Sequence, residues 1–321
     1  MNLRTAESVS PKHPDKICDQ ISDSVVDAAL SQDPRSRVAV EAVGGHKLLT
    51  IIGEVSSDAD IDYMKIARRF VDDSYEVRVQ VVQQSSEIAS GVDTGGAGDQ
   101  GIMVGYASNE TSSLIPLEVE LSRRLNRYLY AKFPFDGKTQ VTLRDNEILT
   151  IVASFQNSTK RELEDLINKW LKENSHASKV GIYANPAGDW KVGGFDADTG
   201  LTGRKLAVDS YGPRIPIGGG AFSGKDASKV DRSGAYMARK IAVDYLKKRD
   251  ANEVMAQLAY AIGIAEPIEA IVTVDGVEEK VEGYDLTPLG IIDFLKLDQP
   301  QFEQTAQYGH FGNNFTWDKA S

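Results

Sequence analysis

The sequence predicts an α+β fold made of three structurally similar modules in a pseudo-threefold arrangement. The order strand, helix, hairpin, helix, strand can be read three times along the 321 residues, and a repeated unit fixes an architecture before any motif is considered. Each unit follows a split βαββαβ pattern, which favours helices on one face of a sheet. We expect the modules at 1–94, 95–192 and 193–321, the first ending in a mobile loop.

The first module opens with a short strand and a helix that ends before Asp33-Pro34, followed by a hairpin around Gly44-Gly45. Proline does not continue a helix, and paired glycines are typical of tight hairpin turns. A second helix and an alternating strand complete the unit. Its elements are expected at Leu3–Glu7, Pro14–Leu30, Arg37–Val43, Lys47–Val55, Ile61–Ser74 and Val77–Val82.

The second and third modules repeat this order. The turn of the second hairpin, Asp145-Asn146, is a weaker signal than Asn-Gly. Second-module elements are expected at Gly101–Ala107, Leu117–Phe133, Lys138–Phe155 (the hairpin), Thr159–Asn174 and Val180–Ala184. Third-module elements are expected at Lys205–Tyr211, Ser228–Lys248, Val254–Ile264, Ile268–Val274, Thr287–Leu295 and near Phe302–Tyr308.

Composition narrows the possible functions. The chain has 41% hydrophobic and 26% charged residues, a composition typical of a soluble protein. Its net charge of −11 argues against nucleic-acid binding. No apolar run approaches a membrane span, and the N-terminus lacks the central apolar region of a signal peptide. We therefore predict a cytoplasmic protein with no membrane partner. The single cysteine, Cys18, is expected in a helix core.

The richest motif is GGGAFSGKDASKVDR at Gly218–Arg232. Its glycines allow backbone N–H groups to approach an anion, and its lysines lie at a predicted helix start, which suits a polyphosphate with its metal. Gly219 to Lys225 fits the Walker phosphate-binding pattern G-x-x-x-x-G-K, but Asp226 stands at the next position, where that pattern has a Ser or Thr that binds magnesium. A glycine-rich turn before a solvated basic helix would look similar. A second basic turn, DTGLTGRK at Asp198–Lys205, favours the anion site.

Other residues are weaker signals taken singly. His13, Asp15 and Lys16 offer a hydrogen-bond donor, a magnesium ligand and a positive charge within one helical turn, although Asp15 could simply cap the helix. Glu41 and Glu54 lie on paired strands among apolar neighbours, where a carboxylate needs a cation or amino group, or faces solvent. Asp99, Asp136 and Lys138 are indecisive alone. The polar, glycine-rich segment 83–99 suits either a linker or a lid, and its G-x-G-x-x-G run lacks a preceding strand.

Together these motifs resemble the S-adenosylmethionine synthetase (methionine adenosyltransferase) family over nearly the whole chain. The matching motifs are HPDK, GAGDQG, DTGLTGRK, GGGAFSGKDASKVDR and YGHFG, in that order. The resemblance implies three similar α+β domains and attack by methionine sulfur on C5′ of ATP. Tripolyphosphate is released and cleaved to pyrophosphate and phosphate. A homodimer with shared active sites and packed sheet faces, or a tetramer of such dimers, is implied as well.

The resemblance also assigns roles by matching position. His13 would donate to the departing 5′ oxygen, while Lys138, Arg204, Lys205, Lys225 and Lys229 hold the triphosphate. The ATP-binding residues would be His13, Lys16, Asp136, Lys138, Trp190, Asp198, Arg204, Lys205, Lys225 and Lys229. Methionine would be bound by Glu54, Gln84, Asp99 and Lys229. Asp15 and Asp231 would bind two Mg²⁺ ions, and Glu41 a K⁺ ion.

The chain departs from the family pattern at Lys12, where glycine is usual, at Trp190, where phenylalanine is usual, and in a shorter loop between Gln84 and Asp99. Two rival classes fit part of the pattern: another ATP-dependent enzyme such as a kinase or ligase, and a non-catalytic nucleotide-binding regulator. A kinase would need a base near an acceptor hydroxyl and a Walker-type Ser or Thr, and neither is evident. A regulator would lack one of the matched charges, and all are present.

Overall fold

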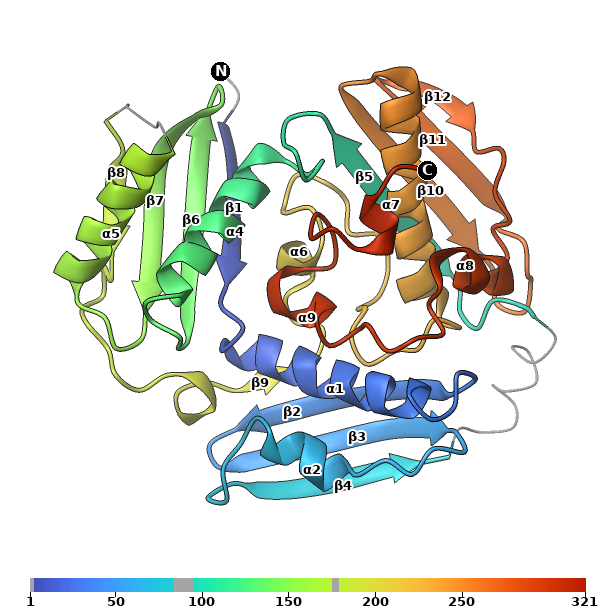
Figure 1. The fold of residues 1–321 in the computed structure, drawn as a ribbon, viewed down its shortest axis with the longest axis horizontal. Coiled ribbons are helices and arrows are strands. Elements are labelled where there is room, and N and C mark those ends of the chain that lie inside the picture. Colours follow the sequence, from blue (N-terminus) through green and yellow to red (C-terminus); the bar gives the residue numbers. More distant parts are fainter. Residues whose placement is uncertain (1–2, 84–94, 175–178) are drawn as a thin grey trace.

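The computed structural model describes residues 3–83, 95–174 and 179–321. In these residues the chain forms three four-stranded sheets, each covered on one face by helices (Figure 1). The three predicted hairpins are confirmed at 37–56, 137–155 and 253–274. Each hairpin forms the centre of one sheet.

The first sheet has the order β4-β3-β2-β9. Its strands are β2 (Arg37–Gly45), β3 (Leu48–Ser56), β4 (Glu76–Val82) and β9 (Gly200–Leu201). Buried Val38, Val40 and Ala42 alternate along β2 and face α1 (Pro14–Leu30), whose predicted bounds are confirmed. The predicted second helix is shorter in the structure, α2 (Tyr63–Arg68).

The second sheet has the order β1-β6-β7-β8, and the third has the order β5-β10-β11-β12. The second-sheet strands are β1 (Leu3–Val9), β6 (Gly137–Arg144), β7 (Glu147–Phe155) and β8 (Gly181–Ala184); its helices are α4 (Leu117–Tyr130) and α5 (Lys160–Glu173). The third-sheet strands are β5 (Gly101–Ser108), β10 (Glu253–Tyr260), β11 (Glu269–Val274) and β12 (Val277–Lys280); its helices are α7 (Val230–Arg249) and α8 (Pro288–Leu295). The remaining short elements are η1 (Gly194–Asp196), α6 (Leu206–Asp209), α9 (Thr305–Tyr308) and η2 (Thr316–Asp318).

Each sheet takes one edge strand from a distant part of the chain. β1 pairs antiparallel with β6, β5 with β10, and β9 with β2. The sequence predicted β1 and β5 as strands correctly, but it placed them in the first and second modules, beside hairpins with which they do not pair. Periodicity reports which face of a strand is buried, whereas the pairing partner depends on contacts far away in sequence.

Two predicted elements of the third module are wrong. The segment 205–211 contains helix α6 instead of a strand, because Asp209 forms an ion pair with Lys16 and Arg123 donates to the Val208 and Ser210 carbonyl oxygens. The segment 302–308 ends in helix α9. The fourth strand of the third sheet is β12, which follows a tight Asp275-Gly276 turn with both φ angles positive.

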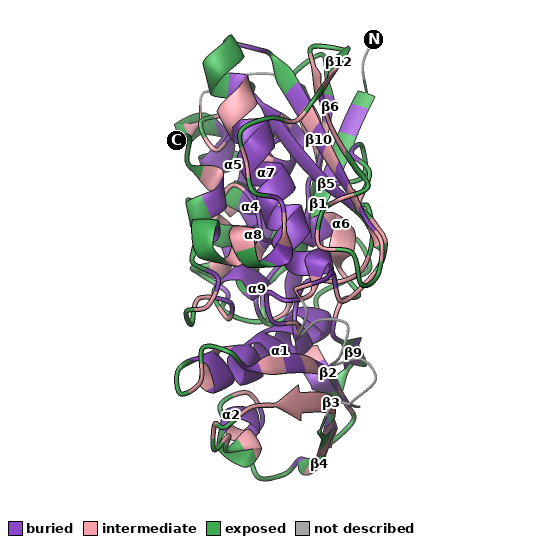
Figure 2. Ribbon diagram, turned by 90° about the vertical axis from the view of Figure 1, so that its right-hand side faces the viewer, coloured by how far each residue is buried: buried purple, intermediate pink, exposed green. Residues whose placement is uncertain are grey.

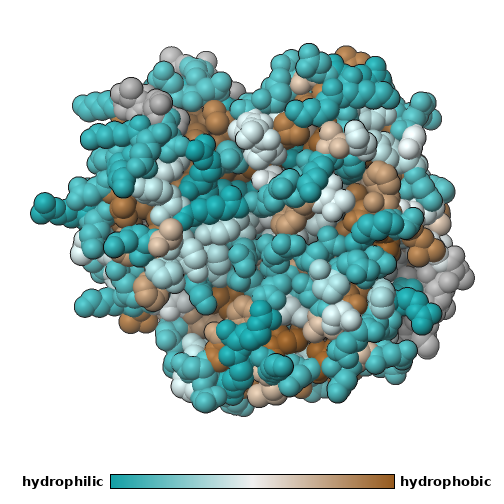
Figure 3. Space-filling view, viewed as in Figure 1, coloured by the Kyte–Doolittle hydropathy of each residue, from teal (hydrophilic) through white to brown (hydrophobic). Residues whose placement is uncertain are grey.

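Two apolar clusters support this architecture. The larger one joins the first and third sheets through α1 and α7, and the smaller one lies between the second sheet and α4 and α5. Figure 2 shows α1 and α7 as mostly buried helices. The face seen in Figure 3 is mostly hydrophilic, with smaller hydrophobic areas between polar side chains. Among residues 3–83, 95–174 and 179–321, no helix has both the length and the apolar character needed to span a bilayer.

Candidate active site

The two basic, glycine-rich turns lie along one edge of β2. One edge of this strand pairs with β3, and the other receives β9 and an isolated antiparallel bridge between Ala39 and Lys225. Gly224, with φ of 82°, is needed at this approach, because a Cβ there would lie 1.9 Å from the Val40 carbonyl oxygen. The structure therefore brings the two predicted anion-binding turns to the same strand.

Two helices begin beside these turns. His13 is the N-cap of α1, and Lys229 is the N-cap of α7. The first turn of each helix leaves backbone N–H groups without helical partners and carries the positive end of the helix dipole. Both starts therefore favour an anion, in agreement with the lysines and arginine around them.

His13 is buried and electrically neutral. Burial, with the positive charges of Lys205 and Lys138, lowers the pKa of His13 to about 3. Its Nδ1 accepts a hydrogen bond of 3.2 Å from the Asp15 backbone N–H. Nδ1 therefore carries no proton, and the neutral ring must hold its proton on Nε2. This tautomer makes His13 a hydrogen-bond donor through Nε2.

Asp15 joins the α1 start to the 198–205 turn. Its Oδ1 accepts from the Leu201 backbone N–H at 3.0 Å, and its Oδ2 accepts from Lys205 Nζ at 2.5 Å. Burial would raise the pKa of Asp15, but these hydrogen bonds outweigh it and hold the pKa below its usual value. Arg204 is exposed, with Nε 3.7 Å from Asp15 Oδ1.

Three further predicted residues gather near His13. The charge of Lys138 on β6 lowers the pKa of both His13 and Asp136, and the charge of Asp198 raises the pKa of both. Asp136 Oδ2 accepts from the Gly194 backbone N–H at 3.1 Å, and burial raises the pKa of Asp136. We call His13, Asp15, Asp136, Lys138, Asp198, Arg204 and Lys205 the His13 cluster. The first sheet's edge and the second sheet both contribute to it.

Lys16 does not face this cluster. Its ammonium is completely buried, lies 2.9 Å from Asp19 Oδ2 and forms a second ion pair with Asp209. Burial and Asp209 raise the pKa of Asp19 to about 7, although Lys16 opposes the shift. This geometry supports a structural role for Lys16 in joining α1 to α6, and its predicted contact with ATP stays a prediction.

Trp190 lies close to the Asp136 side of the cluster. Its indole Nε1 donates to Asn185 Oδ1 at 3.4 Å, and a Cβ at Gly193 would come within 2.7 Å of its ring. Gly193 directly precedes Gly194, the residue whose N–H contacts Asp136. The half-buried ring therefore lies near Asp136, which is predicted to contact the nucleoside. Stacking of Trp190 on adenine stays a prediction.

The second group of predicted residues surrounds the start of α7. Lys225 Nζ lies 2.6 Å from Asp231 Oδ2, and the other carboxylate oxygen accepts from the Gly220 backbone N–H at 3.2 Å. Glu41 and Glu54 interact electrostatically with each other, and Lys225 interacts with Glu41. Burial raises the pKa of Glu41, and Lys225 partly opposes this shift. We call Glu41, Glu54, Lys225, Lys229 and Asp231 the Lys225 cluster.

Glu41 and Glu54 lie on the outer face of the first sheet, opposite α1. Their neighbours along each strand point the other way, since Val40 and Ala42 are buried and Val55 packs against the larger apolar cluster. Exposed Ile52 shares this outer face, because it pairs in register with Glu41. The Lys225 cluster therefore borders a face that combines carboxylates with exposed apolar side chains.

The predicted methionine residues are placed only in part. Asp99 accepts from the Gln100 backbone N–H at 2.8 Å, and a Cβ at Gly101 would lie 3.9 Å from Asp231 Oδ1, so this segment passes near the Lys225 cluster. Gln84 and most of the segment predicted as a loop or lid lie outside the described residues.

The carboxylates do not form a ready-made metal site. In the described part of the chain, no group of three or more His, Cys, Asp or Glu residues could hold an ion. Asp15 and Asp231 each offer one carboxylate, held by a backbone N–H and a lysine. Mg²⁺ is often bound through one or two carboxylates plus substrate phosphates. The donor set therefore fits Mg²⁺ that is also bound by a triphosphate.

Comparison with known proteins gives the same assignment over the whole chain. Models of the N-terminal, central and C-terminal domains of S-adenosylmethionine synthetase match residues 1–94, 94–190 and 192–319. An S-adenosylmethionine synthase of Helicobacter hepaticus is 40% identical, with 99% of this chain and 95% of that protein covered. One from Petrotoga mobilis is also 40% identical, over 99% and 96%. The chain belongs to the S-adenosylmethionine synthetase family.

In this member of the S-adenosylmethionine synthetase family, a line of acidic residues supports the site, and sequence reasoning missed most of it. Asp15, Asp19, Asp23 and Asp27 recur every four residues and so share one face of α1. Asp23 is fully buried, pairs with Arg232 at 2.7 Å and accepts from the Gly224 N–H at 2.8 Å. Carboxylates repeated along a buried helix need such partners. That repeat was the available signal.

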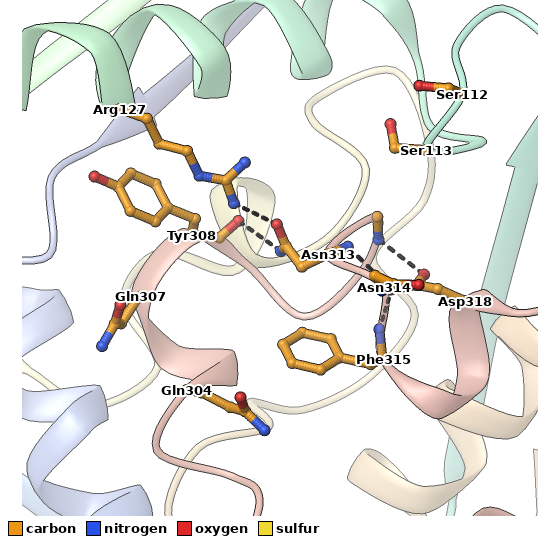
Figure 4. A pocket seen from close by; sticks show the side chains of 11 residues that line it. Ser112, Ser113, Arg127, Gln304, Gln307, Tyr308, Asn313, Asn314, Phe315 and Asp318 are labelled. Carbon is orange, nitrogen blue, oxygen red and sulfur yellow. Dashed lines mark hydrogen bonds between the residues drawn. The ribbon is translucent and has the colours of Figure 1, made fainter.

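A separate pocket of about 680 Å³ lies between α4, α9 and the C-terminal segment of this synthetase-family chain (Figure 4). Arg127 donates to Asn313 at its wall and also contacts the ring of Tyr308. The lining contains none of the predicted ATP, methionine or metal residues. This pocket therefore does not coincide with the predicted site residues.

Proposed function

We propose that this chain forms S-adenosylmethionine from ATP and L-methionine at the site built from the His13 and Lys225 clusters. The proposed reaction rests on membership of the S-adenosylmethionine synthetase family, shown by relatives that are 40% identical over 99% of the chain. The observation that supports the location is that each chain carries both basic turns along one edge of β2. In the shared-site dimer proposed below, the His13 cluster of one subunit would meet the Lys225 cluster of its partner. The kinase, ligase and regulator alternatives have no observation in their favour.

The proposed chemistry needs no general base. The neutral methionine sulfur attacks C5′ of ATP, a C–S bond forms, and the C5′–O5′ bond breaks. The bonding electrons leave with the triphosphate, and the sulfur becomes a sulfonium. His13 would donate its Nε2–H to the departing oxygen, consistent with its tautomer. Lys138, Arg204, Lys205, Lys225 and Lys229 would stabilise the triphosphate charge, which is greatest as the bond breaks.

The same lysines would hold tripolyphosphate while it is hydrolysed to pyrophosphate and phosphate. Orientation and stabilisation of charge are the two contributions that the chain's own residues offer to both steps. Glu54, Asp99 and Lys229 are proposed to recognise methionine, with Gln84 from the segment outside the described residues. Asp136, Asp198 and Trp190 are proposed to contact the nucleoside.

Asp15 and Asp231 are the proposed carboxylates for two Mg²⁺ ions, which would neutralise phosphate charge when bound. Glu41 is the proposed ligand of a K⁺ ion. We expect Asp15→Asn and Asp231→Asn each to raise the Mg²⁺ concentration required for half-maximal activity, because an amide is a poorer ligand for a hard cation than a carboxylate. Magnesium titrations of the purified variants measure this. Curves that overlay that of the parent protein would contradict the assignment.

The reaction itself is tested by product analysis. Purified protein incubated with ATP and methionine should yield S-adenosylmethionine, phosphate and pyrophosphate in equal amounts, measured by mass spectrometry and phosphate assays. Omitting either substrate should abolish all three products. Release of ADP would favour a kinase, AMP with an acyl-adenylate would favour a ligase, and binding of ATP with no product would favour a regulator.

A homodimer with shared sites is also proposed. Ile52 and Val82 are 47% and 50% exposed on the outer face of the first sheet, and Ile102 is 51% exposed on the third. A contact between identical sheet faces would bury such residues on both copies. Because Glu41 and Glu54 lie on the same outer face, the Lys225 cluster would then border the second subunit. The expected module boundaries remain 1–94, 95–192 and 193–321.

A further inference from the structure

Asp226 stands in the glycine-lysine turn where a Walker-type loop would carry a metal-binding hydroxyl, but its side chain is already committed. Its carboxylate is buried, with the side chain 5% exposed. Oδ1 accepts from the Val38 backbone N–H at 2.7 Å, and Oδ2 accepts from the Ser228 backbone N–H at 2.8 Å. These two bonds fix the carboxylate between strand β2 and the first turn before α7.

The same carboxylate holds the ammonium of Lys229. Lys229 Nζ lies 2.5 Å from Asp226 Oδ1, and the Lys229 backbone N–H donates to the Asp226 carbonyl oxygen at 3.2 Å. Burial would raise the pKa of Asp226, but the charge and hydrogen bond of Lys229 and the backbone donors outweigh it and lower the pKa. Asp226 therefore stays ionised at neutral pH and gives Lys229 a fixed partner.

A lysine has four rotatable bonds, so an unrestrained ammonium would lose much conformational freedom when it binds a phosphate. A carboxylate held by two backbone donors removes that freedom in advance. Asp231 is bound by fewer donors. It accepts from Lys225 and from one backbone N–H, and its proposed ligand is a metal ion. Asp226 has its two oxygens occupied by three donors from the protein itself.

We propose that Asp226 is a positioning residue that holds the Lys229 ammonium toward the triphosphate while anchoring the turn to β2. The proposal rests on the proposed function only in naming the triphosphate as the ligand of Lys229. Asp226 itself touches neither substrate nor metal.

The test is a double-mutant cycle of Asp226→Asn, Lys229→Met and the double variant in the full-length protein. Each is assayed for kcat, for KM of ATP, and for the dissociation constant of inorganic tripolyphosphate by calorimetry. We expect Asp226→Asn alone to weaken tripolyphosphate binding and lower kcat by roughly tenfold, the scale of one charged hydrogen bond. In the Lys229→Met background the same change should cost less than about twofold, because the residue that it positions is gone.

Two results would overturn the proposal. Equal losses in both backgrounds would mean that Asp226 acts on the fold and not through Lys229. Tighter tripolyphosphate binding by Asp226→Asn would mean that the carboxylate competes with phosphate for Lys229. If Asp226→Asn is too unstable to assay, Asp226→Glu, which keeps the charge but moves it by one methylene, goes through the same cycle with the same criteria.

Asp318 provides a matched control. It is also a buried carboxylate that accepts from backbone N–H groups, of Gly312 and Asn313, and from a cation, Arg239. It does not contact either cluster. Asp318→Asn should lower the unfolding temperature but leave tripolyphosphate affinity and kcat unchanged; a loss matching that of Asp226→Asn would make the effect nonspecific. Tripolyphosphate binding is measured without turnover, so the cycle remains informative even if no S-adenosylmethionine is formed.

Discussion

Lys225 is the residue whose charge should matter most when the triphosphate departs. Its ammonium is 2.6 Å from Asp231 and is carried on the turn that bridges to β2. We expect Lys225→Ala to lower kcat by about 10² to 10³, the usual cost of losing one contact to a developing anion. Methionine binding should change far less, because the lost charge stabilises the transition state more than the ground state.

Steady-state kinetics with each substrate varied measures this difference. Lys169→Ala is a suitable control, because Lys169 is exposed on α5 and pairs only with its helical neighbour Glu173 at 3.7 Å among the ion pairs of the described residues. An unchanged kcat with a raised KM for ATP would show that Lys225 is only a ground-state binding contact.

His310 gives a second residue-scale prediction, concerning stability and pH. Its ring is fully buried, and Nδ1 lies 2.7 Å from the Tyr236 hydroxyl. Burial, reinforced by the charges of Arg232, Lys16 and Arg123, lowers the pKa of His310 well below its usual value. Below about pH 6.5 the unfolded chain therefore binds a proton that the folded chain does not. Stability should fall as pH falls, by up to about 1.4 kcal/mol per pH unit from this group.

Urea unfolding between pH 7.5 and 5.5 checks the sign and the size of this slope. His310→Gln removes the titrating group, so the variant should lose less stability than the parent protein over this interval, whatever its absolute stability. His46→Gln, at an exposed turn, is the control. Identical slopes for His310→Gln and the parent protein would contradict a neutral, buried His310.

At the scale of elements, contact between β5 and α7 is close enough to require a glycine. A Cβ added to Gly105 would lie 2.0 Å from the Ala238 carbonyl carbon, so backbone and helix would have to separate. We expect Gly105→Ala to destabilise the protein by at least about 1 to 3 kcal/mol, the usual cost of overpacking. Activity should fall too, because α7 carries Lys229 and Asp231 at its start.

Denaturant unfolding of Gly105→Ala measures the destabilisation. Gly181→Ala in β8 is the matched strand glycine: its nearest neighbour is the Thr150 methyl group at 3.3 Å, which can shift slightly. We expect a change within about 0.5 kcal/mol for the control. Equal effects of the two substitutions would mean that the tight β5–α7 contact does not limit stability.

Elements with strong local signals could be predicted from the sequence. Helix α1 has Pro14 at its first position and an apolar face, so its limits were predicted correctly. The Asp275-Gly276 turn before β12 was an equally local signal that was overlooked. The pairing of β1 with β6 could not be predicted, because it depends on a register between residues more than a hundred positions apart, such as Thr5 opposite Thr142.

The residues of the candidate site divide in the same way, into those with a local sequence signal and those whose contacts depend on the tertiary fold. Lys225 and Asp231, and His13 and Asp15, were read from motifs, and the structure brings each pair together. Lys16 was assigned to ATP by its position in a motif, but its burial with Asp19 and Asp209 arises from the tertiary fold. Asp226 was noted only as a mismatch to the Walker pattern. Its bond to the Val38 N–H requires the turn to lie on β2, which no local pattern indicates.

At the scale of the whole molecule, the shared-site dimer makes a quantitative prediction. His13→Ala and Lys225→Ala homodimers should both be nearly inactive. When equal amounts are unfolded and refolded together, roughly half of the dimers are mixed, and one of the two sites in each is intact, so activity should return to about one quarter of the parent value. This recovery requires His13 and Lys225 of one site to come from different subunits.

Activity of the refolded mixture is compared with that of each variant refolded alone, and native mass spectrometry establishes that mixed dimers are present. A mixture of two inactive variants that remains inactive despite mixed dimers would show that each site belongs to one chain. A protein that remains monomeric would contradict the dimer itself, together with the proposed burial of the outer sheet faces.

The exchange of edge strands between sheets also has a consequence for synthesis on the ribosome. β1 leaves the ribosome first, but its partner β6 begins only at Gly137. Likewise, β2 is made long before its partner β9, which begins at Gly200. At about 5 to 20 residues per second, the first strand remains without its partner for roughly 6 to 27 s. The nascent chain therefore carries open strand edges for that time, which makes it a candidate for chaperone binding before release.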